Sequence, residues 1–496
     1  MQPIVQYLRA KIRSNPVGLY VLFYTEMWEC FGRFGIISLL VLYLTHSFKL
    51  SDSYAFSIYS GFLALIYVTP IICGQIADRF LGLKHAVILG GFMMIIGNLL
   101  MVIEVPSMVY LGLSIVAVGS GFFLPSIVPL VGNLYHVDDR RRDAGFTLYY
   151  IGKNIGALLA PILCGIVAVC YGYHYAFILS AIGMMTGMVI FIRGHKHLRL
   201  SAMQNEIEYS TEHKYHKKSK KGHLLSYVMA LALIPVTQLI LVKEIDGYLL
   251  LGAGILVVIL LSYLALSHSR VDRSRIAMIS LMMVFVMGFG AFLNQGGTTL
   301  NLFIERIIDR NVLGFNLPTT FFYTLDPVFM IILGPFIAAL WMKLAQKNKE
   351  PSEPTKFSFA MIFLAMGFGV FVLAALQGVK VGHASPLYIV LAYFLFPLAE
   401  LLIMPIGLSL VTKLAPKDME ASLVGVWMLA NAGASYMTGI ISKWGEINFS
   451  YQNVEGLKQA SEIYSRDFGL SAISLILIAL VLILAVRALY IRWIHE

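Results

Sequence analysis

The chain has 496 residues, of which 58% are hydrophobic and only 13% are charged, and its mean hydropathy is +0.79. A soluble domain has roughly 45–50% apolar and about 25% charged residues, so a soluble globular protein is excluded. The net charge of +10 would suit a nucleic-acid-binding protein. Most basic residues, however, fall in short loops on one side of the predicted membrane, as the positive-inside rule requires. We expect a polytopic α-helical membrane protein with no nucleic-acid partner.

Windows of about 20 residues with few charges predict fourteen membrane-spanning helices, grouped as six, two and six. They predict an N-terminal six-helix bundle over 1–193, a basic cytoplasmic linker with two extra helices over 194–272, and a C-terminal six-helix bundle over 273–496. A run of His and Lys at 213–221 is typical of a cytoplasmic linker that touches anionic lipid. The spans lie at about 17–46, 53–77, 84–104, 107–135, 143–170, 172–193, 223–242, 247–269, 274–304, 318–346, 355–377, 385–413, 419–443 and 467–494.

The loop charges predict the orientation. With the N-terminus inside, eight Lys and Arg residues lie outside, two (Arg33 and Lys153) lie within spans, and all others lie inside. Both termini are therefore expected in the cytoplasm. The first apolar segment is too long for a cleavable signal and carries two acids.

The first span carries Glu26, Glu29 and Arg33, which are spaced by three and four residues. On an α-helix this spacing places them on one face, and Glu29 and Arg33 form an i,i+4 pair with the acid first. Charges at that depth cost several kcal/mol unless they are paired or hydrated, so they indicate a functional site. A pair that only neutralises itself within the helix is the alternative.

Several motifs in both halves together resemble the proton-dependent oligopeptide transporter family, within the major facilitator superfamily. The resemblance runs from about residue 15 to 490 and includes the extra helix pair common in bacterial members. It implies a major facilitator fold with alternating access in a bacterial cytoplasmic membrane, and we expect a monomer. The motifs are Ala77-Asp78-Arg79-Phe80-Leu81-Gly82, Arg142-Asp143-Ala144-Gly145, Tyr149-Tyr150-Ile151-Gly152-Lys153-Asn154, Phe292-Leu293-Asn294-Gln295-Gly296, Leu325-Asp326-Pro327, Ala399-Glu400-Leu401 and Gly425-Val426-Trp427.

The first helix of that family typically reads Glu-x-x-Glu-Arg-Phe-x-Tyr-Tyr-Gly. The two acids match, but Cys30 stands where the family has arginine, and Arg33 and Phe34 stand where it has two tyrosines. Ile37 and Leu124 occupy the places of a further arginine and of a lysine. Three expected cations are thus missing, and two unexpected ones, Arg33 and Lys153, are present.

The resemblance also implies roles for further residues. Glu400 matches the acid that holds a peptide's amino end, while Asp326 replaces the asparagine that assists it, and Met404 replaces a small polar residue. Asn154 matches a binding-site asparagine, and Gln295, Tyr67 and Trp427 fall at cavity-lining positions, although Tyr67 and Trp427 equally fit plain packing. Lys153 could instead point into a helix interface. The loop residues expected to act in gating are Asp78, Arg79, Arg142 and Asp143.

These observations favour a proton-coupled symporter of small amino-containing solutes, above all di- and tripeptides. Glu26 and Glu29, with Arg33, would handle the proton, and Arg33 and Lys153 would receive a substrate carboxylate. One alternative is a transporter of a non-peptide amine or an amino-acid-like metabolite, and another is a non-transporting sensor or scaffold. No nucleophile–base constellation, metal-ligand spacing or phosphate loop is found, so we expect no enzyme, no cofactor and no metal site.

Overall fold

The computed structural model describes the chain except for residues 1–14, 136–138, 140, 205–219, most of 244–269, 313, 348, 350, 352, 415–419, 450–452 and 496. Side chains at 143–144, 199–204, 220–221, 270–277, 345, 353–354, 404–414, 420–425 and 485–495 are also outside the description. The described residues form two compact units. Unit 1 is drawn from Met1–Ile36 and Val68–Val242, and unit 2 from Ile37–Tyr67 and Lys243–Glu496.

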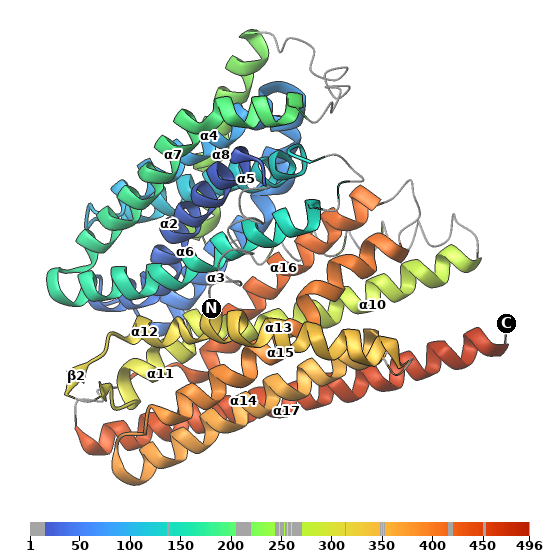
Figure 1. Ribbon diagram of the computed structural model, residues 1–496. Helices are drawn as coiled ribbons and strands as arrows, with labels where there is room; N and C mark the ends of the chain where they lie inside the picture. Colours follow the sequence, from blue (N-terminus) through green and yellow to red (C-terminus); the bar gives the residue numbers. More distant parts are fainter. Residues whose placement is uncertain are drawn as a thin grey trace, which may run out of the picture. The chain divides into compact units, whose positions relative to one another are not determined.

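Both units are built almost entirely of helices (Figure 1). The chain runs through α2 (Val17–Ser47), α3 (Asp52–Ile76), η1 (Ala77–Leu81), α4 (Leu83–Leu100), α5 (Pro106–Gly132), α6 (Arg142–Tyr171), α7 (Tyr173–Gln204) and α8 (Lys220–Lys243). It continues through α10 (Arg270–Leu293), η3 (Asn294–Gly297), α11 (Thr299–Ile307), β1 (Asn311–Val312), β2 (Phe315–Asn316), α12 (Thr319–Tyr323), α13 (Leu325–Gln346), α14 (Glu353–Val381), α15 (Leu387–Leu414), α16 (Glu420–Ser442), η4 (Lys443–Gly445) and α17 (Val454–His495).

Eleven helices of the described residues are long and apolar enough to cross a membrane. The prediction of an all-α membrane protein is therefore confirmed. The predicted spans at 385–413 and 419–443 correspond to α15 and α16. The predicted span at 247–269 lies mostly outside the described residues, so the total of fourteen stays a prediction.

The predicted helix over 274–304 is wrong in one respect, because it is broken. After α10 the chain makes the 3₁₀ turn η3 and restarts as α11, with Thr298 at φ −119° and ψ −105°. Gly296 and Gly297 allow the break: a Cβ at Gly297 would collide with the Tyr59 hydroxyl. Irregular backbone at membrane depth is tolerated only where protein buries it or where it lines a cavity. The break is therefore a candidate position for a functional site.

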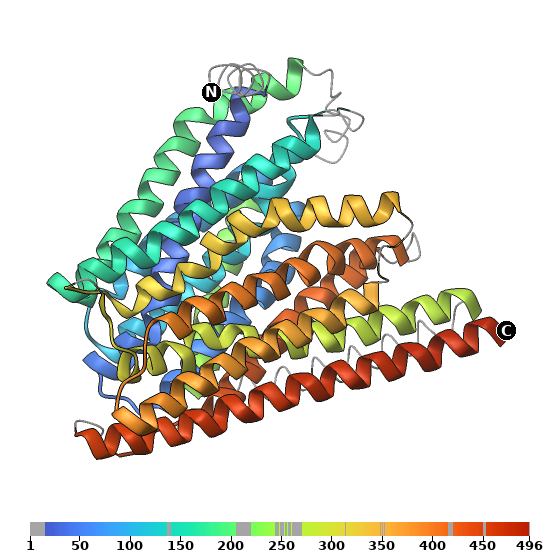
Figure 2. The ribbon, with the colours of Figure 1, turned by 60° about the horizontal axis from the view of Figure 1, so that its bottom comes forward.

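Two more predicted boundaries differ from the structure. The span predicted at 318–346 is divided at Thr324 into α12 and α13, and Pro327 lies in the first turn of α13, where its missing N–H costs nothing. The last helix, α17, begins at Val454 rather than near 467 and packs along α14 (Figures 1 and 2). Polar residues in the first turns of α17 lower the mean hydropathy there, so a hydropathy window places the start of the helix too late.

Small residues set the spacing between α2 and α6 in unit 1. A Cβ at Gly152 would meet the carbonyl and ring of Phe23, and one at Gly156 would meet the Met27 carbonyl and Cys30. With no Cβ at these two positions the backbones approach closely. This approach places Tyr149 and Lys153 of α6 beside the acidic face of α2.

The turn between α3 and α4 forms as its sequence suggests. Residues of Ala77–Leu81 make the π-helical turn η1, which ends at Gly82 with φ +85°, a conformation that glycine adopts without strain. Buried residues of this turn join α4, α5 and α8 in one apolar cluster through Ala77, Leu81, Phe122 and Ala230. The first extra helix, α8, is thus packed onto unit 1.

Candidate functional site

The charged face of α2 is buried in unit 1. The exposed fractions of Glu26, Glu29 and Arg33 are 2%, 0% and 8%. Arg33 donates from Nε to Glu29 Oε1 at 2.8 Å and from Nη2 to Glu29 Oε2 at 3.3 Å. The predicted i,i+4 pair is therefore confirmed, and it is a two-point, charge-assisted contact of the strong kind.

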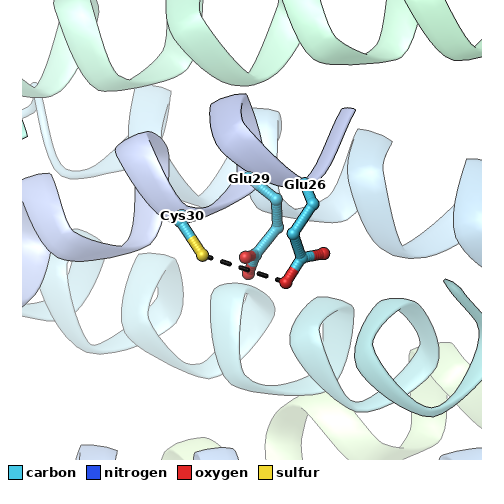
Figure 3. A group of neighbouring side chains, drawn as sticks. All are labelled: Glu26, Glu29 and Cys30. Atoms are coloured by element: carbon cyan, nitrogen blue, oxygen red, sulfur yellow. Dashed lines mark hydrogen bonds between the residues drawn. The ribbon is translucent and has the colours of Figure 1, made fainter. Parts of the chain in front are cut away.

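Glu26 lies in a different environment from Glu29. Its carboxyl oxygen Oε1 accepts a long contact of 3.9 Å from the Cys30 thiol (Figure 3), while Oε2 is buried without a hydrogen-bond partner. Glu29, Arg33 and Lys153 all act on it electrostatically, and the Tyr149 hydroxyl approaches it. Glu26 thus has no cation in direct contact and a second acid beside it, an arrangement that favours the neutral, protonated acid.

Lys153 is the second cation predicted within a span, and it lies half-buried near the same cluster. Its Nζ lies 5.8 Å from the centroid of the Tyr150 ring, and the charges of Glu26 and Arg33 act on it. The pattern alone left open whether Lys153 points to this cluster or into an unrelated helix interface. The structure brings it to the acids of α2.

Glu26, Glu29 and Cys30 place one ligand atom each within 4.8 Å of one another, a spacing that a metal ion could use (Figure 3). The charge around them argues against a metal ion. Arg33 already contacts Glu29, and its Nη2 also lies 3.4 Å from Cys30 Sγ. Two acids and two cations leave this cluster close to neutral, so a divalent cation would meet repulsion from Arg33 and Lys153.

A second polar cluster lies in unit 2, around the break at η3. Gln295 is fully buried, and neither atom of its side-chain amide has a hydrogen-bond partner. A Cβ at the neighbouring Gly296 would lie 3.3 Å from the Tyr323 ring and 3.5 Å from the Tyr393 hydroxyl. Tyr323 hydrogen-bonds to Tyr59. The break between α10 and α11 thus brings the backbone of Gly296 and Gly297 close to Tyr59, Tyr323 and Tyr393.

The two predicted acids of unit 2 join this cluster. Asp326 and Glu400 are half-buried on the neighbouring helices α13 and α15, and they act on each other electrostatically. Asp326 Oδ1 is buried without a hydrogen-bond partner, and so is the Tyr393 hydroxyl. Tyr67, also predicted, acts on Tyr59 and Tyr323 from α3. The structure therefore brings Gln295, Asp326, Glu400 and Tyr67 into one region.

The remaining predicted residues lie in other surroundings. Asn154 donates to the Tyr150 carbonyl of its own helix at 2.8 Å. Trp427 is 7% exposed and belongs to the apolar core of unit 2, which favours the packing interpretation. Asp78 and Arg79 are exposed in η1, and Arg142 lies over the Phe146 ring at 5.7 Å. The side chain of Asp143 and that of Met404 lie outside the described residues.

The position of Glu305 and Arg306 at the end of a predicted span suggests a gate or surface pair, but their partners in unit 2 were not predictable from the sequence. Arg306 of α11 holds Asp52 of α3 through two hydrogen bonds of 2.6 and 2.7 Å, and its Nη1 also donates to the Tyr464 hydroxyl at 3.1 Å. The backbone N–H of Ile447 donates to Asp52 at 3.3 Å. Nothing local marks Asp52, which looks like an ordinary acidic residue in the first turn of a helix.

Two further contacts join the same elements. His46 Nε2 lies 2.8 Å from Glu305 Oε1, and Asn301 donates to the Ser38 carbonyl at 3.0 Å. The later part of α2 and the start of α3 are thus fastened to α11 by polar contacts between residues far apart in the sequence.

The family model described as the POT family matches residues 84–449 of the chain. The chain belongs to the POT family. It is 33% identical over 433 residues to the uncharacterized transporter YclF of Bacillus subtilis, covering 85% of the chain and 86% of the relative. It is 30% identical to the peptide transporter YePEPT of Yersinia enterocolitica, covering 95% of the chain and 94% of the relative.

The structure is also similar to a solved POT family member, described as the peptide transporter POT in complex with sulfate. The TM-score is 0.81 with 28% identity, over 96% of this chain and 95% of the other. POT family members are membrane transporters of the major facilitator fold, so this chain is a multi-pass membrane transporter and not an enzyme. The predicted family, fold class and transport function are confirmed.

Proposed function

We propose that this POT family transporter takes up di- and tripeptides together with protons by alternating access. We place it in a bacterial cytoplasmic membrane as a monomer with both termini in the cytoplasm. Its parts would be the bundles 1–193 and 273–496, joined by the linker and extra helices of 194–272. Family membership and similarity to a relative described as a peptide transporter support this proposal.

The observation that supports the coupling mechanism is that two neighbouring acids lie in different electrostatic environments. Glu29 has a two-point contact with Arg33, whereas Glu26 has no cation in contact. We assign the transported proton to Glu26 in this state. A substrate carboxylate that binds Arg33 would compete with Glu29 for the same donors, so the proton affinity of this pair of acids would rise and fall with substrate occupancy.

Unit 2 would favour a positively charged group of the substrate. Asp326 and Glu400 supply negative charge for an ammonium group, and tyrosine hydroxyls and the Gln295 amide supply hydrogen bonds. Asn154 and Lys153 of α6 would add contacts near the carboxylate end.

The contacts of Arg306 with Asp52 and of Glu305 with His46 act, in this proposal, as the outside gate. They fasten the ends of α2 and α3 to α11. Access from outside would require these contacts to break, and they would form again after the substrate has bound. Asp78, Arg79, Arg142 and Asp143 would play the matching structural part at the inside loops.

Uptake into proteoliposomes under an imposed inward proton gradient tests the function. Labelled dialanine should accumulate only with the gradient, and unlabelled di- and tripeptides should compete while single amino acids and simple amines should not. If no dipeptide competes, the peptide class is removed and a non-peptide amine becomes the substrate class. If accumulation is independent of the gradient, proton coupling is refuted.

A further inference from the structure

Two histidines from different helices of unit 1 lie against each other. The ring centroids of His85 in α4 and His223 in α8 are 4.9 Å apart, and the ring planes are inclined by 50°. Both residues lie in the first turn of their helices. His85 is exposed and His223 is half-buried, so a small ligand can reach the pair. This pair has no part in the transport mechanism proposed above.

The packing of α8 keeps the two rings together. A Cβ at Gly222 would lie 3.5 Å from the Phe80 carbonyl oxygen, so the backbone at the start of α8 lies close to η1. Further along α8, Ala230 is buried in one apolar cluster with Ala86, which follows His85 in α4. The two rings therefore project from backbones that are already packed together, which is what a preorganised binding site needs.

The hydrogen bond made by the His85 ring is the one expected of a metal ligand. The ring donates to the backbone carbonyl of Leu81, four residues earlier. A neutral imidazole has one N–H, so the other ring nitrogen of His85 keeps its lone pair. Histidines that bind metals almost always donate their second ring N–H to a carbonyl or a carboxylate, and this bond fixes the orientation of the ring.

The distance between the two rings suits one metal ion. A Zn²⁺ ion lies about 2.0–2.1 Å from each imidazole nitrogen, so two rings on one tetrahedral ion have centroids about 5.2 Å apart. The observed separation of 4.9 Å is close to this value. Two charged rings that donate to one phosphate oxygen would have centroids about 6 Å apart or more, and at a shorter distance they would repel each other. The separation thus favours a metal ion over an anion.

The charges around the pair differ from those around the acids of α2, where Arg33 directly contacts one of the possible ligands. At the histidine pair, Lys84 and His195 act electrostatically on His85. Consecutive residues of a helix do not face each other, so Lys84 and His85 lie on different faces of α4. His195 belongs to α7, which packs against α4, and a neutral imidazole is itself a common metal ligand.

We propose that His85 and His223 bind one divalent transition-metal ion of the Zn²⁺ class, and that this ion ties the start of α8 to α4. Imidazole nitrogens suit Zn²⁺, Cu²⁺ and Ni²⁺, whereas Mg²⁺ and Ca²⁺ prefer oxygen ligands. Water molecules or His195 would complete the coordination. The two histidines lie far apart in the sequence, so no local ligand spacing marks them. Such binding is independent of the proposed transport function.

Calorimetric titration of the purified, chelator-treated protein without an affinity tag tests this site. ZnCl₂ should show one saturable site and MgCl₂ none. His85→Asn and His223→Asn should each weaken Zn²⁺ binding at least about tenfold, because each removes one ligand. His174→Asn is the matched control, since His174 lies 3.5 Å from Glu104 beyond the other end of α4. Its loss should change Zn²⁺ binding by less than about twofold.

Absence of saturable Zn²⁺ binding overturns the proposal, and so does unchanged binding in either His85→Asn or His223→Asn. Cu²⁺ in place of Zn²⁺ provides a test that needs no variant. Its electron paramagnetic resonance spectrum should show splitting by two ring nitrogens, and splitting by one nitrogen or none overturns the site. Saturating Zn²⁺ should also raise the unfolding temperature of the unmodified protein by at least about 2 °C, and no rise contradicts the tie between α8 and α4.

Discussion

The acids of unit 1 and those of unit 2 have different charged and polar neighbours. On α2, Glu29 is neutralised by Arg33 four residues away, and Lys153 is near enough to act on Glu26. On α13 and α15, Asp326 and Glu400 are surrounded by tyrosines and an amide. The first arrangement contains two cations of its own unit, whereas Asp326 has a second acid, Glu400, acting on it. In the proposed function, unit 1 would therefore favour an anionic group and unit 2 a cationic one.

Removal of Arg33 should have the largest effect, because it takes the cation out of the first arrangement. Arg33→Ala leaves Glu29 fully buried without its partner, and breaking a buried pair this way costs about 3–5 kcal/mol. We expect gradient-driven uptake to fall at least about a hundredfold by the scale of one tenfold per 1.4 kcal/mol, and the protein to unfold at a lower temperature in detergent.

The double variant Arg33→Ala with Glu29→Gln serves as the control, since it removes both charges. Its thermal stability should recover most of the loss although uptake stays low. If Arg33→Ala lowers stability but leaves substrate affinity and driven uptake unchanged, Arg33 is only a helix partner and the contrast between the two units fails.

Substitutions in the proposed gate pair, Asp52 and Arg306, should have the next largest effect on uptake. Asp52→Asn should slow uptake about five- to hundredfold, since residues of one buried ion pair couple by about 1–3 kcal/mol. The exchange of both residues, Asp52→Arg with Arg306→Asp, should restore part of the rate. His46→Gln is the matched control, because His46 is 40% exposed and exposed pairs contribute about 0–1 kcal/mol. Initial uptake rates for the unmodified protein, Asp52→Arg, Arg306→Asp and the double exchange give the coupling, and additive losses would show that the pair is not a gate.

A variant of Lys153 tests whether this residue contacts the carboxylate of the substrate. Lys153→Met keeps the length of the side chain and removes its charge. We expect the concentration for half-maximal competition by dialanine to rise about tenfold, while that for dialanine amide, which has no carboxylate, changes little. Equal changes for both peptides would place Lys153 in a structural role.

The smallest effect should come from an acid outside both arrangements. Asp467 of α17 is fully buried, neither of its carboxyl oxygens has a hydrogen-bond partner, and Gly445 packs against it. A carboxyl in such a place is stable only as the neutral acid. Asp467→Asn should therefore change thermal stability by less than about 1 kcal/mol and leave uptake unchanged, since nothing charged is lost. A large loss of driven uptake would make Asp467 a third acid in the coupling.

Local patterns in the sequence predicted most of the helices and half of the site. Hydropathy located the apolar spans, and the i,i+4 spacing predicted the contact between Glu29 and Arg33. The break at Asn294–Gly297 was not predictable from hydropathy, because glycine pairs are also common inside unbroken membrane helices. Asp52 and Arg306 lie 254 residues apart, and neither residue carries a local sign of its partner. Only packing brings them together.

In the proposed function Glu26 carries the transported proton, while Glu29 is occupied by its two-point contact with Arg33. The direct test compares two assays in the same proteoliposomes, accumulation of dialanine driven by a proton gradient and exchange of labelled for unlabelled dialanine without a gradient. Glu26→Gln mimics the protonated acid, so driven accumulation should be lost while exchange continues at a rate within about threefold of the unmodified protein. Undiminished driven accumulation in Glu26→Gln would contradict the account.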